Sequence, residues 1–135
     1  MTADRRAVPE APLRVLCVED EPDMQLMERF ALEDLGGFRV RLCGSAEEAL
    51  RDPPDPPPDL ILLDSVLPGM DGEDALRAFR SRPETARTPV IFLTGRAAEG
   101  EAERLLGLGA RGVIPKPFDP ETLAGRVREI LEAPR

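Results

Sequence analysis

Apolar residues recur along the chain in short runs, separated by stretches with a different periodicity. Each run has the length of a β-strand, and its nearly continuous apolar character is typical of a strand buried on both faces. The runs predict strands over 13–18, 38–42, 60–63, 89–93 and 112–115.

Helical spacing fills the intervals between these runs. After the first run, apolar side chains recur at intervals of three and four, which is typical of one helix face, at Met24, Met27, Phe30, Ala31 and Leu35. Helices are predicted over 22–35, 45–51, 72–81, 97–107 and 120–132. Gly100 falls inside the fourth of these helices and should weaken it by about 1 kcal/mol relative to alanine.

Residues that favour helix ends support these boundaries. Three helix starts are indicated, by Pro22, by a capping box of Ser45 and Glu48, and by Asp119 followed by Pro120. The pair Gly36–Gly37 indicates a helix end. Strict alternation of strand and helix predicts an α/β fold, in which helices cover both faces of a five-stranded parallel sheet. In such a sheet, ligands bind outside the carboxyl ends of the strands.

One connection breaks the alternation. The segment 51–59 reads RDPPDPPPD, and its five prolines exclude a helix or a paired strand. We expect a stiff extended connector. Its PxxP spacing leaves a docking motif for an aromatic groove open as an alternative.

Composition restricts the class of protein. A chain of 135 residues is one ordinary domain, which we place at 13–132, with a flexible leader over 1–12 and a tail over 133–135. The net charge of −8 argues against direct nucleic-acid binding, and no apolar run is long enough to span a membrane. Because no apolar segment follows the arginines near the start, no secretory signal is indicated, and we expect a cytoplasmic protein.

Missing residue types exclude several kinds of catalytic and metal site. The sequence contains no histidine, which excludes Ser-His-Asp hydrolysis, His-ligated zinc and a phosphohistidine carrier. Cys17 and Cys43 lie inside apolar segments and are expected to be buried side chains without a function.

The predicted strand ends carry the polar side chains that remain as candidates for a site. Four of the predicted strands are followed by such residues, which are Glu19 and Asp20, Asp64, Thr94, and Lys116. These side chains should converge on one edge of the sheet. Three carboxylates in proximity repel one another unless a cation lies among them. An all-oxygen site favours Mg²⁺, with Mn²⁺ as an alternative.

Lys116 is the only lysine among 18 basic residues. An ammonium is a compact point charge, whereas a guanidinium is a broad planar fork that needs more room. The bias toward arginine elsewhere therefore indicates that this position requires a lysine.

The strand-end residues lie in four longer segments: VLCVEDEP at 15–22, DLILLDSVLPGMDG at 59–72, PVIFLTGRA at 89–97 and GLGARGVIPKPFDPETL at 107–123. Together these segments resemble the receiver domain of two-component response regulators in its chemotaxis-type single-domain form. The resemblance implies a flavodoxin-like doubly wound (βα)5 fold with strand order 2-1-3-4-5. It also implies that Asp64 is the phosphoacceptor, that Thr94 and Lys116 contact the phosphoryl group, and that Glu19, Asp20, Asp64 and the backbone carbonyl of Val66 bind Mg²⁺.

The resemblance further implies partners. Asp64 would receive its phosphoryl group from a sensor histidine kinase or a histidine phosphotransfer protein, so the chain would be a signalling acceptor and not an enzyme. We expect no output domain after residue 132. Phosphorylation is then expected to change the affinity of the face built from 97–107, 112–115 and 120–132 for a protein target, in a monomer or a phosphorylation-dependent dimer. An intermediate role in a phosphorelay is also open.

Four positions depart from the usual pattern of that family. Glu19 stands where aspartate is frequent, and Val113 stands where many members carry the aromatic residue that turns inward on phosphorylation. Gly95 replaces alanine or serine and leaves room beside the phosphoryl group. Val66 cannot orient a hydrolytic water, so self-dephosphorylation should be slow; Arg96 flanks the site on the other side.

Two other functions are alternatives. An unphosphorylated pseudo-receiver that acts as an interaction module would keep the fold and lack the modification, and Val113 is compatible with it. A small phosphohydrolase of the haloacid-dehalogenase type would need a second aspartate two residues after Asp64, where this chain has Val66.

Overall fold

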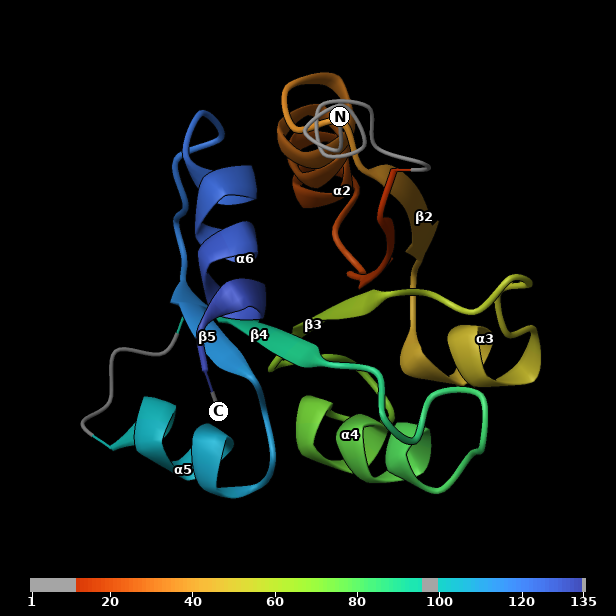
Figure 1. Cartoon of the computed structure of the whole chain (residues 1–135). Helices are drawn as coiled ribbons and strands as arrows, with labels where there is room; N and C mark the ends of the chain where they lie inside the picture. The colour runs from red at the N-terminus through yellow and green to blue at the C-terminus, as the bar shows by residue number, and fades with distance from the viewer. Residues whose placement is uncertain (1–11, 96–99, 135) are drawn as a thin grey trace, which may run out of the picture.

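The computed structural model describes residues 12–95 and 100–134 and contains one parallel five-stranded sheet (Figure 1). The strand order is β2-β1-β3-β4-β5. The strands are β1 (Arg14–Val18), β2 (Arg39–Cys43), β3 (Leu60–Asp64), β4 (Val90–Thr94) and β5 (Gly112–Pro115). The predicted fold class and strand order are therefore confirmed, and the strand bounds agree with the prediction within one residue.

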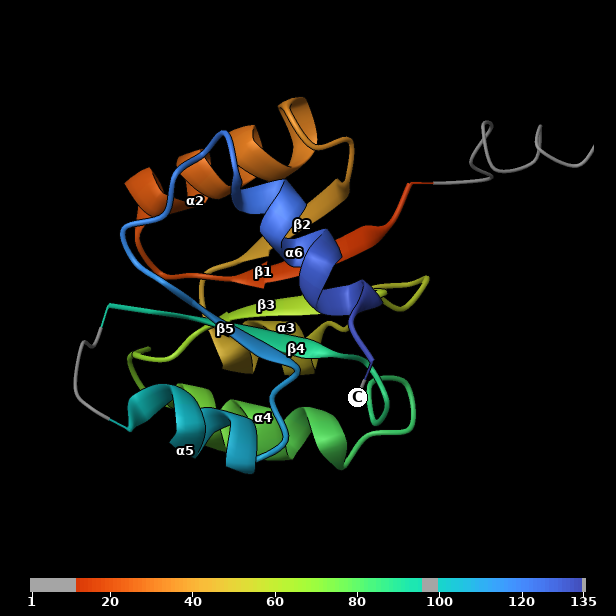
Figure 2. The ribbon, with the colours of Figure 1, turned by 60° about the vertical axis from the view of Figure 1, so that its left-hand side comes forward.

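Helices cover both faces of the sheet, as Figures 1 and 2 show. One face carries α2 (Pro22–Arg29), its continuation η1 (Phe30–Asp34) and α6 (Leu123–Glu132), and the other carries α3 (Ala46–Arg51), α4 (Gly72–Arg80) and α5 (Glu101–Gly107). Each layer encloses its own apolar cluster, with β1 contributing Val15 and Cys17 to one and Leu16 and Val18 to the other. This alternation explains why the strands read as continuous apolar runs.

The first helix differs from its prediction in two ways. It continues as the π-helical turn η1, in which the Leu35 N–H donates to the Phe30 carbonyl. Met27, Phe30 and Leu35 are exposed, so the predicted apolar face was wrong in these three positions. The buried side instead carries Glu28 together with Ala31 and Leu32. A carboxyl group occupies an inward position there, and the longer π-turn bond shifts Leu35 off that face.

The predicted helix over 97–107 was also wrong at its start. Gly100 has a φ of 87° and precedes α5, so it is not an interior helix residue. A left-handed backbone cannot continue a right-handed helix, and glycine adopts it without steric cost. The Gly100 carbonyl accepts the Arg104 N–H and so starts the helix. Positions 97–99 of that prediction lie outside the described residues.

The last helix begins at Leu123, three residues later than predicted, because residues 120–122 form a turn. Asp119 still caps this turn, since its Oδ1 accepts the Glu121 N–H at 2.9 Å. The capping box at α3 is confirmed in part. Ser45 Oγ accepts the Glu48 N–H at 3.1 Å, but Glu48 Oε1 accepts the Gly44 N–H at 3.0 Å instead of that of Ser45.

The remaining expectations concern connections and ends. Residues 52–59 contain neither helix nor strand, as the prolines predicted. Cys17 and Cys43 are both buried and unpaired, which confirms the predicted burial. Of the expected leader over 1–12, residues 1–11 lie outside the described part of the chain, as does residue 135 of the tail. No helix within the described residues is long and apolar enough to cross a membrane.

Candidate functional site

The five residues predicted from the strand ends lie at the carboxyl edge of the sheet. Asp64 is the last residue of β3 and Thr94 the last residue of β4. In the sheet register, Asp64 pairs with Leu93 and Thr94 with Pro115, so β3, β4 and β5 end within one residue of one another. Glu19 and Asp20 follow β1, and Lys116 follows β5. Parallel strands thus bring together residues that are far apart in the sequence.

Lys116 joins two of the carboxylates. Its Nζ lies 2.9 Å from Asp64 Oδ2 and 3.2 Å from Glu19 Oε1. Both acids are buried, with exposed fractions of 7% for Asp64 and 1% for Glu19. Charge-assisted hydrogen bonds of this kind are stronger than neutral ones, and a buried acid needs such a partner. The side chain of Lys116 itself is only 18% exposed.

Asp64 is held at both of its oxygens. Oδ2 accepts from Lys116, and Oδ1 accepts the backbone N–H of Val66 at 3.0 Å. The aspartate side chain is therefore fixed in orientation before any ligand arrives. Val66 itself is 50% exposed, in the loop between β3 and α4. The ligand role of its carbonyl stays a prediction.

The donor set fits a hard divalent cation. Glu19, Asp20 and Asp64 each offer a carboxylate oxygen, and these oxygens lie within 4.8 Å of one another. Asp20 is exposed, which leaves one side of the cluster open to solvent. With Lys116 nearby, the three carboxylates leave a local charge of −2, which a divalent ion would neutralise. Oxygen donors without thiolate or imidazole are typical of a site for Mg²⁺.

The ionisation of these groups follows from their contacts. Burial and the charge of Asp64 raise the pKa of Glu19, while Lys116 and the Glu21 N–H act to lower it. Burial alone would lower the pKa of Lys116, but its bonds to Asp64 and the charges of Asp64 and Glu19 raise the pKa above its ordinary value. Lys116 therefore carries its positive charge throughout the physiological range.

Thr94 and Gly95 form the neighbouring wall of the site. Thr94 is buried, with a 4% exposed fraction, and its carbonyl accepts the Lys116 N–H at 2.8 Å. This bond ties the backbone of Lys116 to the end of β4. A Cβ atom added to Gly95 would lie 4.0 Å from the Lys116 Cβ, with no closer neighbour, so the glycine leaves the space beside the lysine open. Arg96, predicted to flank the site, lies outside the described residues.

Glu28 is a member of this cluster that sequence reasoning missed. It lies on α2 with an exposed fraction of 1%, close to Glu19. Burial and the proximity of Glu19 raise its pKa from 4.5 to about 9, so it is a neutral acid at neutral pH. Burial of Cys17 raises the pKa of its thiol, and the proximity of Glu28 raises that pKa further. The spacing of Glu28 from Met24 and Ala31, four and three residues away, was the available signal.

Sequence comparison identifies relatives for most of the chain. The family described as response regulator receiver domain matches residues 15–128. The phosphate regulon transcriptional regulatory protein PhoB of Rhizobium meliloti (strain 1021) is 39% identical over 118 residues, which are 87% of this chain and 52% of that protein. The transcriptional regulatory protein CpxR of Escherichia coli (strain K12) is 40% identical over 120 residues, which are 87% of this chain and 49% of that protein. The chain spans about half the length of these curated relatives.

Solved structures give the same result over nearly their full length. The chemotaxis protein CheY4 of Vibrio cholerae superimposes with a TM-score of 0.80 at 29% identity, covering 89% of this chain and 99% of that one. The receiver domain of the sensor histidine kinase PA1611 of Pseudomonas aeruginosa PAO1 has a TM-score of 0.77 at 32% identity, covering 91% of this chain and 100% of that one. That structure has a magnesium ion coordinated in its active site cleft.

Proposed function

The chain belongs to the response regulator receiver domain family, and from this premise we propose that it accepts a phosphoryl group on Asp64 in a two-component or phosphorelay pathway. The observation that carries the proposal is the position of Asp64, a buried aspartate at a strand end. Its two oxygens are held separately by Lys116 Nζ at 2.9 Å and by the Val66 N–H at 3.0 Å. A carboxylate oriented in this way is prepared for attack on an incoming phosphorus atom.

The proposed step is a phosphoryl transfer from a phosphohistidine. A carboxylate oxygen of Asp64 forms a bond to phosphorus, the P–N bond of the donor imidazole breaks, and the electron pair of that bond returns to the imidazole nitrogen. The product on this chain is an acyl phosphate. Such transfers pass through a loose transition state that needs positioning and charge neutralisation. Lys116 contributes to both, because its ammonium already contacts Asp64.

Glu19, Asp20 and Asp64, with the carbonyl of Val66, are the residues proposed to hold Mg²⁺. The ion would supply neutralisation of the negative charge on the transferring group. Mn²⁺ prefers the same oxygen donors and is the expected substitute. Support comes from the magnesium ion in the related receiver domain of PA1611 and from the donor set of this chain.

Thr94 is proposed to donate its hydroxyl to a phosphoryl oxygen. It follows Phe92 and Leu93 at the end of β4, and its carbonyl is bonded to the Lys116 N–H. The open space at Gly95 would admit the phosphoryl group between these two residues. In this role Thr94 reports the modification to the segment that follows it, toward α5.

The donor is proposed to be a sensor histidine kinase or a histidine phosphotransfer protein. The output is proposed to be a changed affinity of the face built from α5, β5 and α6 for a protein target. Val113 of β5 is half-buried and packs against the apolar cluster under α4 and α5, at the position where many members of the family carry an aromatic switch residue. Switching would therefore rely on Thr94 and the backbone, in a monomer or a phosphorylation-dependent dimer.

A single-domain mode of action in the cytoplasm is part of this proposal; the chain covers 99% of CheY4 and about half of the curated relatives. In that mode the chain is a signalling acceptor that assists its own phosphorylation and dephosphorylation, and it is not an enzyme with a separate substrate.

Intact mass after incubation with Mg²⁺ and acetyl phosphate tests this function. We expect one added phosphoryl group in the wild type, and none in Asp64→Asn or in the presence of a chelator. Asp59→Asn, a change of the same kind just before β3, should behave as the wild type. A folded protein that gains no mass and does not bind beryllofluoride would contradict the proposal and would favour the pseudo-receiver.

A further inference from the structure

The outer edge of β2 is open, and its backbone groups alternate in direction. β2 pairs only with β1 among the strands of the sheet. The Arg39 N–H donates to the Leu13 carbonyl, and the Cys43 carbonyl accepts the Glu19 N–H, so these residues face β1. In a parallel strand the residues between them face the other way. Val40 and Leu42 therefore present their N–H and C=O groups at the free edge.

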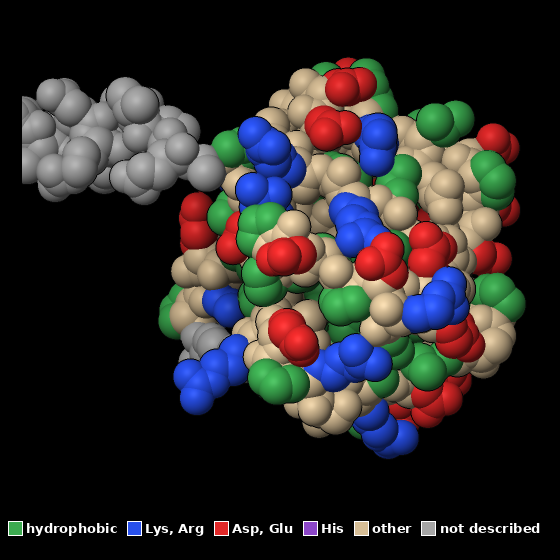
Figure 3. Space-filling model, turned by 90° about the vertical axis from the view of Figure 1, so that its right-hand side faces the viewer, with side chains coloured by type: hydrophobic (Ala, Val, Ile, Leu, Met, Phe, Trp, Pro, Cys, Tyr) green, Lys and Arg blue, Asp and Glu red, His purple; other side chains and the backbone are tan. Residues whose placement is uncertain are grey.

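Arginine side chains follow this edge on one face of the sheet. Arg39 and Arg41 lie two residues apart, so they project from the same face, and Arg14 is the register partner of Arg39 on β1. Figure 3 views the side of the molecule on which β2 and α3 lie and shows basic and acidic side chains interspersed over it. In a chain with a net charge of −8, β2 itself carries two arginines and no acidic residue.

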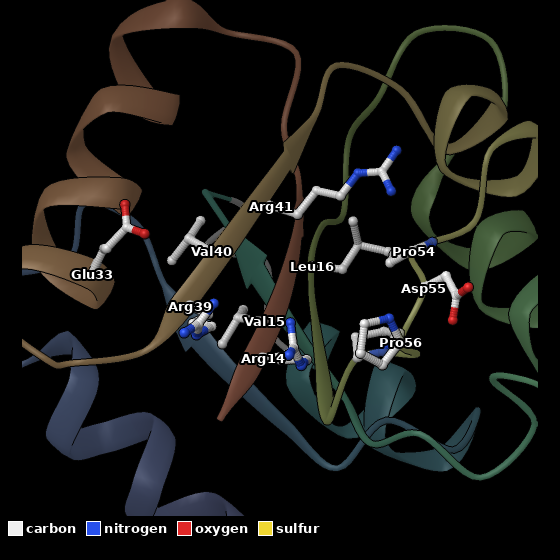
Figure 4. A pocket seen from close by; sticks show the side chains of 11 residues that line it. Arg14, Val15, Leu16, Glu33, Arg39, Val40, Arg41, Pro54, Asp55 and Pro56 are labelled. Atoms are coloured by element: carbon white, nitrogen blue, oxygen red, sulfur yellow. The ribbon is translucent and has the colours of Figure 1, made fainter. Parts of the chain in front are cut away.

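A groove of about 290 Å³ lies beside these arginines. Figure 4 shows Arg14, Arg39 and Arg41 on the two strands, with Pro54, Asp55 and Pro56 of the proline-rich connector on the other side of the groove. The connector and the shortness of α3 leave this part of the sheet without a covering helix.

Two of the three guanidinium groups are available for a new ion pair. Arg41 bonds Asp52 at 3.2 Å, and Glu33, an acid of the groove wall, pairs with Arg29 at 3.6 Å. The side chains of Arg14 and Arg39 make no ion pair or hydrogen bond with any residue in 12–95 or 100–134. An incoming carboxylate would therefore meet Arg39 without displacing an existing partner.

We propose that the outer edge of β2 binds an extended segment of a partner protein that carries an acidic side chain at every second position. The segment would add a sixth strand to the sheet by bonding Val40 and Leu42, and its acidic residues would lie beside Arg39 and Arg41 and reach toward the groove. Strand addition of this kind obtains affinity from the backbone and specificity from alternate side chains. Neighbouring strands lie about 4.8 Å apart, so side chains on one face are in contact across the pair.

Charge also decides against a second copy of this chain as the occupant. If two β2 edges paired about a twofold axis, the arginines of one copy would lie opposite those of the other. Like charges directly opposite destabilise a strand pair. Charged side chains on an edge strand also discourage pairing with arbitrary strands of other proteins. The proposed binding must therefore depend on the alternating acidic pattern of the partner segment.

The test uses two blocked hexapeptides of equal composition, one alternating valine and glutamate and the other with its three glutamates consecutive. Each is titrated into the ¹⁵N-labelled protein at low ionic strength, without Mg²⁺ or a phosphodonor. We expect the alternating peptide to shift the amide resonances of Val40 and Leu42 and to slow their hydrogen exchange, and the consecutive peptide to bind more weakly. Arg39→Glu should weaken binding of the alternating peptide about tenfold.

Arg87→Glu is the matched control, because Arg87 is an exposed arginine that lies before β4, away from β2. It should bind as the wild type does. Equal binding of the two peptides, unshifted amides at Val40 and Leu42, or full binding by Arg39→Glu would overturn the proposal. The same shifts with inorganic phosphate alone would reduce the surface to a simple anion site and would also overturn it. Asp64→Asn should bind the peptide normally, so this test is independent of the phosphoacceptor function.

Discussion

The ammonium of Lys116 contacts Asp64 across the width of a strand. Lys116 follows β5 and Asp64 ends β3, and β4 lies between these strands in the sheet, yet Nζ and Oδ2 are 2.9 Å apart. The same nitrogen reaches Glu19 after β1 at 3.2 Å. One cation thus bridges the ends of three strands, and a long side chain with a compact charge is suited to that position.

Lys116→Arg should slow acyl phosphate formation. The planar guanidinium needs more room than the ammonium and would not reproduce both bonds. Loss of a hydrogen bond between charged groups costs about 1.5–3 kcal/mol, which corresponds to a rate about 10- to 100-fold lower. The time course of intact mass with acetyl phosphate and Mg²⁺ measures this. Arg87→Lys, a cation exchange at an exposed position, is the control, and wild-type kinetics in Lys116→Arg would show that any cation suffices.

Most of the site was predictable because parallel strands place their carboxyl ends at one edge. The strands could be recognised from apolar runs, and each polar residue just after a run then became a candidate, as Asp64 and Thr94 show. What the pattern could not supply is the geometry of the contacts. The reach of Lys116 across β4 depends on the sheet twist and on the side-chain conformation, which involve the whole fold.

Glu28 and Gly100 were misread for local reasons. Periodicity analysis assigns apolar residues to the buried face, so it assigned exposed Met27 and Phe30 to that face and passed over buried Glu28. A glycine inside a helical pattern can also mark a helix end, and only the φ of 87° distinguishes the two at Gly100. At Glu28 the contacts of the buried carboxyl group decide against the apolar pattern, whereas at Gly100 the backbone conformation itself excludes an interior helix position.

Glu28 should make the metal-free protein less stable as pH rises. Its pKa is about 9 in the folded state against 4.5 ordinarily, so between these values the folded state binds a proton that the unfolded state releases. The free energy of unfolding then falls with increasing pH, by about 1.4 kcal/mol for each pH unit. Its contribution is fully present below the lower value and is lost as pH rises through the upper one.

Urea unfolding of Glu28→Met at pH 5 and at pH 8 tests this effect. The variant should exceed the wild type in stability by more at pH 8 than at pH 5, because methionine fills a similar volume and does not titrate. Glu129→Met, at an exposed position of α6, should leave the pH dependence unchanged. Parallel pH profiles of Glu28→Met and the wild type would show that Glu28 is ionised in the folded protein.

Asp20→Asn should have opposite effects on stability without metal, where it relieves repulsion among the carboxylates, and with Mg²⁺, where it removes a metal ligand. Without metal, removal of one of three close negative charges should raise the free energy of unfolding by about 1 kcal/mol. With MgCl₂ the wild type should gain about 1.4 kcal/mol when Mg²⁺ is tenfold above its Kd, and the variant should gain much less. Thermal unfolding with MgCl₂ against NaCl of equal ionic strength measures both. An equal response of the two proteins to MgCl₂ would place the ion elsewhere.

Substitution of two glycines by alanine should change the free energy of unfolding in opposite directions. A Cβ on Gly72 would lie 2.8 Å from Phe92 Cε1 and 2.9 Å from the Asp64 carbonyl oxygen, so Gly72→Ala should lower the free energy of unfolding by about 2 kcal/mol. A Cβ on Gly125 would meet nothing within 4 Å, and Gly125 lies inside α6. Gly125→Ala should therefore raise stability by about 1 kcal/mol. Denaturant unfolding checks the pair, and equal signs would contradict the close packing of α4 against β3 and β4.

Val66→Asn should shorten the life of the acyl phosphate, if Asp64 is the acceptor as proposed. Val66 is 50% exposed beside Asp64, and its backbone N–H already bonds Oδ1, so the side chain can change without loss of that bond. An apolar side chain cannot hold a water molecule, whereas an amide can orient one toward the phosphorus atom. We expect decay about tenfold faster, followed by intact mass after removal of the phosphodonor. Val66→Leu should decay like the wild type, and equal decay in Val66→Asn would mean that water reaches the phosphoryl group by another route.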